Sequence, residues 1–198
     1  MGQPETKIGL FGGTFNPVHI GHLLIGEWIR EEYDLNRIIY IPSGHPPHKR
    51  EQEITPIHHR WKMLELASAG NPHFSLSDFE KNSGKVSFTI DTIEHFVHQF
   101  NLRRDGLYLI VGEDSLRDLP TWRKPDEIAR LCRITVAHRR GLTTNTISSP
   151  AFSDIIYSSV PLIDISSSEI RTRVSEGKSI RYMVPSVVEE YIKEKELY

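Results

Sequence analysis

The sequence has a single cysteine, Cys132, which excludes an internal disulfide and a zinc site built on paired thiolates. It also lacks any apolar run near the ~18 residues that a membrane-spanning helix needs. Its first residues show no positively charged stretch followed by an apolar segment and a cleavage site. We therefore expect a protein of the reducing cytoplasm that does not enter a membrane.

An excess of charge of one sign is lacking too. The chain has 24 Lys and Arg against 26 Asp and Glu, a net charge of -2 at pH 7. Basic residues gather only locally, at 48–50, 103–104, 123–124 and 138–140. Because a balanced chain has no overall attraction for nucleic acid, we expect no nucleic-acid partner. The sequence gives no sign of the oligomeric state.

Strand-like and helix-like patterns alternate along the whole chain. A buried strand is predicted at Lys7–Phe11 and a second at Arg37–Ile41, with apolar residues at helical spacing between them. This is the strand–helix–strand unit that builds parallel sheets. A length of 198 residues suits one domain, 1–198. The predicted fold class is α/β, a doubly wound Rossmann-like parallel sheet flanked by helices.

The later elements follow from the same patterns. The helix at Ile57–Ala69 is expected to pack through Trp61, Leu64 and Ala67 or Ala69, and Thr89 to cap the helix Ile90–Phe100. The other predicted elements are strands at 74–76, 107–111, 134–137, 155–157 and 161–163 and helices near 167–176 and 186–196.

A segment at 42–56 carries four prolines and several charges without periodicity. Such a stretch is typical of a long surface loop that can act as a lid over a substrate. A linker between domains is the alternative, but neither flank makes a self-sufficient domain. We therefore favour a loop.

The stretch GGTFNPVHIGH at 12–22 places two glycines after a strand and two histidines, His19 and His22, at the start of a helix. Asn16 can cap that helix and Pro17 suits its first position. Free N–H groups at a helix start favour anions, so the histidines are expected to flank a phosphate. Metal binding and core packing are the alternatives. No Cys pair or His-Glu-x-x-His pattern supports the former.

A second helix start is predicted near the C-terminus, where Ser166 and Glu169 have the spacing of a capping box. Arg171 would lie in its first turns. A guanidinium beside free backbone donors suits a polyphosphate, because it stays charged and makes bidentate contacts. A serine cap with an ordinary surface arginine is the alternative, which the histidine motif makes less attractive.

The stretch at 12–22 resembles the signature of the nucleotidyltransferase superfamily, and the longer match is to bacterial nicotinate-nucleotide adenylyltransferases. Four more segments fit that family in order: PPHK at 46–49, SFTIDT at 87–92, GED at 112–114 with Trp122 and Arg123, and ISSSEIR at 165–171. The match covers almost the whole chain. It departs from the family at Asn16, Phe88 and 138–141.

The resemblance implies transfer of AMP from ATP to nicotinate mononucleotide without a covalent enzyme intermediate. It implies catalytic roles for His19, His22 and Arg171. It implies nucleotide-binding residues as follows: Gly12, Gly13, Thr14, Phe15, Gly112, Asp114 and Ser167. Mg²⁺ would bind through ATP oxygens and water, with no dedicated protein ligands.

The acceptor side also follows from the resemblance. Thr89 matches the position that binds the pyridine carboxylate, and a helix start there offers suitable N–H donors. Trp122 matches the aromatic residue that stacks on the pyridine ring, although core packing is open. Lys49, with His48, would reach the phosphates from the 42–56 loop, although a plain surface loop is open.

Other functions share parts of this pattern. A phosphopantetheine adenylyltransferase or a cytidylyltransferase would carry the histidine motif, but Ser87–Thr92 and Trp122 are not expected there. A tRNA synthetase would need a longer chain and a basic RNA-binding surface. A non-catalytic nucleotide sensor is the alternative of a different class, and intact His19, His22 and Arg171 disfavour it.

Overall fold

The computed structural model describes residues 6–44, 54–82, 87–139, 152–161 and 163–198. Six strands form one sheet in the order β3-β2-β1-β4-β5-β6, and every pairing is parallel, as the sequence predicts. The strands are β1 (Ile8–Gly13), β2 (Arg37–Pro42), β3 (Phe74–Leu76), β4 (Leu107–Gly112), β5 (Arg133–Arg139) and β6 (Ile156–Val160). The α/β class and the doubly wound arrangement are confirmed.

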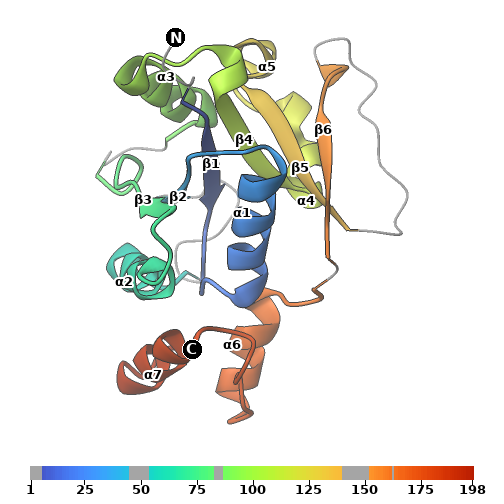
Figure 1. The fold of residues 1–198 in the computed structure, drawn as a ribbon. Coiled ribbons are helices and arrows are strands. Elements are labelled where there is room, and N and C mark those ends of the chain that lie inside the picture. Colours follow the sequence, from blue (N-terminus) through green and yellow to red (C-terminus); the bar gives the residue numbers. More distant parts are fainter. Residues whose placement is uncertain (1–5, 45–53, 83–86, 140–151, 162) are drawn as a thin grey trace.

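Helices connect the strands and extend beyond the sheet. They are α1 (Ile20–Glu32), α2 (Ile57–Ser68), α3 (Thr89–Phe100), α4 (Glu113–Asp118), α5 (Pro125–Leu131), α6 (Ser167–Ser175) and α7 (Ser186–Glu194), with short 3₁₀ turns at Arg104–Gly106 and Leu119–Thr121. Figure 1 shows α1 across one face of the sheet, with α6 and α7 beyond the end of the sheet at which β1 finishes. Within the described ranges no helix is long and apolar enough to cross a membrane.

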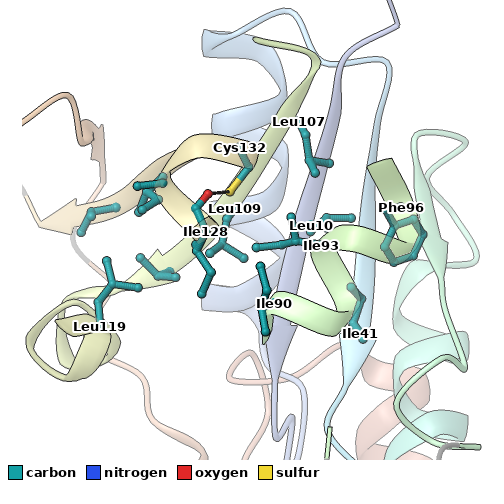
Figure 2. Packing of buried hydrophobic residues seen from close by; sticks show 14 of the residues in the cluster. Leu10, Ile41, Ile90, Ile93, Phe96, Leu107, Leu109, Leu119, Ile128 and Cys132 are labelled. Carbon is teal, nitrogen blue, oxygen red and sulfur yellow. Dashed lines mark hydrogen bonds between the residues drawn. The ribbon is translucent and has the colours of Figure 1, made fainter. Parts of the chain in front are cut away.

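Two apolar clusters lie on opposite faces of the sheet, because successive side chains of a strand alternate between faces. Leu10 and Leu109 join the first cluster with Ile90 and Ile93 of α3. Figure 2 shows α3 turning these side chains toward the strands. The neighbouring residues Phe11 and Ile110 belong to the second cluster, together with residues of α1, α2, α6 and α7.

Several predicted boundaries are wrong by a few residues. Gly12 and Gly13 belong to β1 instead of ending it, since both pair with β2. Thr89 is the first residue of α3, and Phe88 is the N-cap. The last strand, β6, overlaps only the expected strand at 155–157 and extends to Val160. It ends before Pro161, which cannot donate to a ladder, so the strand expected to begin there is not found among the described residues.

The face through which α2 packs differs from the prediction. Trp61 is half-buried and lies under the Lys81 ammonium at 4.6 Å, outside the buried stripe. The buried stripe consists of Arg60, Met63, Leu64 and Ser68. An arginine therefore occupies a core position, where apolar periodicity alone does not look for one.

Candidate active site

The strand order reverses between β1 and β4, so the chain leaves this pair toward opposite edges of the sheet. Ligands of doubly wound sheets bind outside the carboxyl ends of the strands at such a reversal. Gly12 is the last residue but one of β1, and Gly112 is the last residue of β4. A Cβ atom built on either glycine would meet no atom of the described residues within 4 Å. The protein therefore leaves the space at both strand ends open to a ligand.

The turn from β1 to α1 has a constrained backbone. Phe15 is 2% exposed and has φ of 47°, in the left-handed region that costs a non-glycine residue roughly 1–3 kcal/mol. Its ring lies against Gly13, where a Cβ would be 3.0 Å from Phe15 Cζ. Among the described residues, no acceptor is found for the N–H groups of Thr14 and Phe15. Successive N–H groups in such a turn form an anion-binding concavity.

His19 and His22 lie face to face, with ring centroids 3.6 Å apart. The His19 backbone N–H donates to His22 Nδ1 at 3.2 Å, so a neutral His22 ring carries its proton on Nε2. His19 Nδ1 is buried and has no hydrogen-bond partner within the described part of the chain. A buried polar atom without a partner is costly, which is consistent with a ligand that completes the site.

Burial keeps both imidazoles neutral. It lowers the pKa of His19 to about 4. The pKa of His22 lies well below its usual value, first because of burial and second because of the neighbouring His19. At neutral pH the pair therefore offers N–H donors to a phosphate instead of positive charges.

The start of α1 corrects the prediction for Asn16 and Pro17. The N-cap is His19, and the helix begins at Ile20. The Asn16 side chain instead accepts hydrogen bonds from the Thr55 N–H and the Tyr198 hydroxyl. The Ile20 N–H donates to the Met183 carbonyl at 3.0 Å, so this first helical N–H is taken. An anion at this place would therefore meet the N–H groups of the β1–α1 turn more readily than the helix end that the sequence suggested.

The start of α6 meets this turn directly. Ser166 is the N-cap, and its hydroxyl accepts the Glu169 N–H at 3.1 Å, as the capping spacing predicts. The Ser167 hydroxyl donates to the Pro17 carbonyl at 2.8 Å. Arg171 Nη1 donates to the Asn16 carbonyl, also at 2.8 Å. The two motifs that the sequence singled out for phosphate thus form one structural unit.

The predicted acceptor residues lie on the other face of the sheet. Trp122 packs against the first apolar cluster and is half-buried. Arg123 lies over the ring of Phe88, at 4.7 Å from its centroid, which brings Trp122 near the start of α3. The N–H groups of Thr89 and Ile90 have no acceptor among the described residues. An anion at this helix start would meet two free donors.

Two predicted residues cannot be placed in full. Lys49 and most of the 42–56 loop lie outside the described residues. Asp114 lies in α4 just after Gly112, but its side chain is also outside them. Within the described ranges, no group of three or more His, Cys, Asp or Glu side chains could hold a metal ion.

Two residues at the turn were missed by the sequence analysis. Arg60 Nη1 donates to the Thr14 carbonyl at 2.8 Å. The Tyr198 hydroxyl donates to Asn16 Oδ1 at 3.1 Å. The available signal for Arg60 was its spacing, which places it on the same helix face as the apolar residues Met63 and Leu64. No local pattern pointed to the second, which is far from the turn in sequence.

Comparison with known proteins gives a consistent result. The model of the cytidylyltransferase-like family matches residues 10–173. A protein of Thermomicrobium roseum, described as a probable nicotinate-nucleotide adenylyltransferase, is 46% identical over 98% of this chain and 92% of its own length. A protein of Caldicellulosiruptor bescii with the same description is 41% identical, over 97% of this chain and 98% of its own length.

Solved structures agree on the fold. The nicotinic acid mononucleotide adenylyltransferase of Plasmodium falciparum, complexed with NaAD, superposes with a TM-score of 0.78. The match covers 98% of both chains at 19% sequence identity. The same enzyme complexed with APC gives a TM-score of 0.76 at 18% identity. At this level of identity the likeness shows a shared fold.

Proposed function

This chain belongs to the cytidylyltransferase-like family and, within it, to the nicotinate-nucleotide adenylyltransferases, and we propose that it transfers AMP from ATP to nicotinate mononucleotide. The products are nicotinate adenine dinucleotide and pyrophosphate, in NAD biosynthesis. The observation that carries the proposal is the junction of the two phosphate motifs, in which Ser167 and Arg171 of α6 bond to the backbone of the β1–α1 turn.

The reaction requires two polyanions to meet in line. A phosphate oxygen of the mononucleotide attacks the α-phosphorus of ATP, the new P–O bond forms, and the bond to pyrophosphate breaks. Catalysis of such a transfer rests on positioning and on donors that meet the developing charge. We assign this task to four donors: the N–H groups of Thr14 and Phe15, the Nε2–H of His22 and the Arg171 guanidinium.

The neutral state of the histidines suits this role. His19 and His22 lie too close for both to be charged without a ligand, and burial penalises charge on either. A polyphosphate supplies the missing negative charge, so bound ATP raises both pKa values. The fixed positive charge that attracts the substrate comes from Arg171, with the rings donating hydrogen bonds at short range.

The adenosine is assigned to the strand ends. Gly12 and Gly112 leave open space where β1 and β4 finish, and a backbone without a side chain allows close approach of a ribose. Asp114, in the first turn of α4, is assigned to a ribose hydroxyl. We call one part of the site the phosphate end. It consists of the β1–α1 turn, Gly12, His19, His22, Gly112, Asp114 and Arg171.

The pyridine ring is assigned to Thr89 and Trp122, called the pyridine end below. The free N–H groups at the start of α3 donate to the carboxylate, and the helix dipole favours its charge. An amide has no such charge to place there. Trp122 offers an aromatic face to the cationic ring. Preference for nicotinate over nicotinamide is therefore expected.

Two further assignments rest on the sequence. Lys49 is proposed to contact the phosphates from the 42–56 loop. Mg²⁺ is proposed to reach the site on ATP oxygens and water, because the described residues offer no acidic or histidine cluster that would hold it. The cation would screen charge on the phosphates, and no protein ligand is assigned to it.

We propose a cytoplasmic location, which also rests on the sequence. Cys132 is buried and reduced, and its thiol donates to the Ile128 carbonyl at 3.3 Å in the core shown in Figure 2. Burial raises the pKa of this thiol to about 12, so it is inert. A protein that depends on one unreactive thiol and no disulfide fits the reducing cytoplasm.

One assay tests the activity. Pyrophosphate release from ATP is measured with nicotinate mononucleotide, nicotinamide mononucleotide, phosphopantetheine or no acceptor. Release with nicotinate mononucleotide, and less with its amide, is expected. Absence of release with both pyridine nucleotides would exclude the proposal. Release with phosphopantetheine alone would identify a different adenylyltransferase, and binding without turnover would identify a sensor.

A further inference from the structure

Arg60 is a buried cation whose partners are not acids. It is 1% exposed on the inner face of α2. Its Nη1 donates to the Thr14 carbonyl at 2.8 Å and its Nε to the Thr55 carbonyl at 2.9 Å. Among the described residues it forms no ion pair with a carboxylate. Because an unpaired buried charge is costly, its retention here requires an explanation other than stability.

The contact with Thr14 sets the direction of a neighbouring donor. The Thr14 carbonyl and the Phe15 N–H belong to one planar trans peptide and point in opposite directions. With the carbonyl turned toward Arg60, the Phe15 N–H points away from α2. Phe15 has a positive φ that favours relaxation to another conformation. A hydrogen bond from a charged group is of the same order as that strain, so Arg60 can hold the turn against it.

Tyr198 acts on the next residue of the turn. Its hydroxyl donates to Asn16 Oδ1 at 3.1 Å, and the Thr55 N–H donates to the same oxygen at 3.3 Å. The positive charges of Arg171 and Arg60 both act on this hydroxyl. Asn16 also presents its carbonyl to Arg171, the residue assigned to the phosphates. Moving the Asn16 side chain would therefore move the acceptor that orients Arg171.

We propose that Arg60 and Tyr198 are positioning residues for ATP, which orient the Phe15 N–H and Arg171 toward the phosphates from behind the turn. Neither side chain touches the substrate in this arrangement. This inference rests on the proposed function, since it concerns the same site. The inference goes beyond the proposed function because it assigns a role to a residue on the buried face of α2, Arg60, and to a residue of the C-terminal segment, Tyr198.

The first test replaces the guanidinium. Arg60→Met removes both hydrogen bonds, and Arg60→Lys keeps the charge and one donor. We expect Arg60→Met to lower kcat/KM for ATP about 100-fold, as misplacement of reacting groups does, and Arg60→Lys to restore about tenfold of it. Binding of nicotinate mononucleotide, measured by calorimetry, should change less than about twofold, because the pyridine end lies on the other face of the sheet.

Arg104→Lys is the matched control. Arg104 also donates to a backbone carbonyl, that of Ala129 at 2.8 Å, but it lies just before the amino end of β4, away from the carboxyl ends of the strands. Its kinetics should equal those of the wild type. If Arg60→Met only lowers the unfolding temperature and keeps wild-type kinetics in the folded protein, the inference is wrong.

The second test avoids a large change in the core. Tyr198→Phe removes one hydroxyl, and Tyr33→Phe is its control, because Tyr33 bonds Glu32 at the far end of α1. We expect Tyr198→Phe to lower kcat/KM for ATP about tenfold with an unchanged unfolding temperature, a loss of one oriented hydrogen bond. This variant decides the matter if Arg60→Met does not fold. Wild-type kinetics in Tyr198→Phe would overturn the inference for Tyr198. If the wild-type protein itself has no activity, the proposed function is excluded instead.

Discussion

The phosphate end and the pyridine end of the site are supported in different ways. Arg60, Ser167, Arg171 and Tyr198 come from three separate segments and bond directly to residues of the β1–α1 turn. At the pyridine end, by contrast, Phe88 is 37% exposed, and the Arg123 guanidinium lies over its ring. One end is held from behind by buried groups, and the other is open at the surface.

This difference matches the two tasks of the reaction. Stabilising charge in a transition state depends on donors that need no reorganisation, so the phosphate end benefits from fixed groups. Selecting an acceptor depends on its ground-state contacts, which free N–H groups and an aromatic face can supply without a rigid frame. Substitutions at the first end should therefore change kcat, and substitutions at the second should change KM for the mononucleotide.

The largest effect is expected for His22→Ala. It removes the Nε2–H that we assign to the phosphates, and loss of one such donor costs about 10²–10³ in kcat. Steady-state kinetics measure this loss, with calorimetry of mononucleotide binding as the control. Near-normal turnover would refute the role of His22, and weakened mononucleotide binding would show that the two ends are not separate.

The second-largest effect is expected from acid, which should lower the free energy of unfolding through His19 of the phosphate end. The pKa of His19 is lowered to about 4 in the folded protein from 6.5, so the unfolded chain binds more protons between these values. The free energy of unfolding therefore falls as the pH drops from 6.5 toward 4, by up to roughly 3 kcal/mol for this group. Urea denaturation from pH 7 to pH 4.5 measures it. A His19→Gln variant should show a shallower fall, and an identical slope would contradict the assignment.

At the pyridine end, Trp122→Ala should raise KM for nicotinate mononucleotide about tenfold by loss of the aromatic face. KM for ATP should stay near its wild-type value. Trp122→Phe, which keeps a ring, should recover most of the loss. Equal changes in both KM values would indicate that Trp122 acts only through core packing.

The smallest effect is expected from a pair of glycines. Gly12→Ala places its Cβ where none of the described residues has an atom within 4 Å, so stability should hold while KM for ATP rises severalfold. Gly13→Ala places its Cβ 3.0 Å from the Phe15 ring and should instead lower stability by about 1–3 kcal/mol. Thermal unfolding and kinetics on both variants separate ligand space from protein packing. Loss of stability in Gly12→Ala would show that this space is not free.

Most of the fold was accessible from the sequence, because strand and helix periods alternate clearly. The order of the strands in the sheet comes from the structure, whereas the places of most strands along the chain and the cap at Ser166 follow from local patterns. The start of α1 did not, since Asn16 and Pro17 have the composition of a cap but are used by the turn. A tertiary contact, the bond from Thr55 and Tyr198 to Asn16, overrides the local preference.

The site was accessible to the extent that its residues carry a motif. The motifs at 12–22 and 165–171 led to His19, His22 and Arg171. The structure stacks the two histidine rings and places the Arg171 guanidinium on the Asn16 carbonyl of the same turn. Arg60 was not found, because a charged residue in an apolar stripe reads as a helix surface unless its buried partners are known. Tyr198 was not found either, because its contact depends on how the C-terminal segment packs.

The most direct test is a crystal structure with nicotinate adenine dinucleotide bound. The account predicts that pyrophosphate oxygens lie within about 2.7–3.2 Å of the Phe15 N–H and of His22 Nε2, with the pyridine carboxylate at the Thr89 N–H. The Thr14 carbonyl should remain on Arg60. A pyrophosphate bound away from the β1–α1 turn, or a pyridine ring placed at Gly112 instead of Trp122, would contradict the division between the two ends.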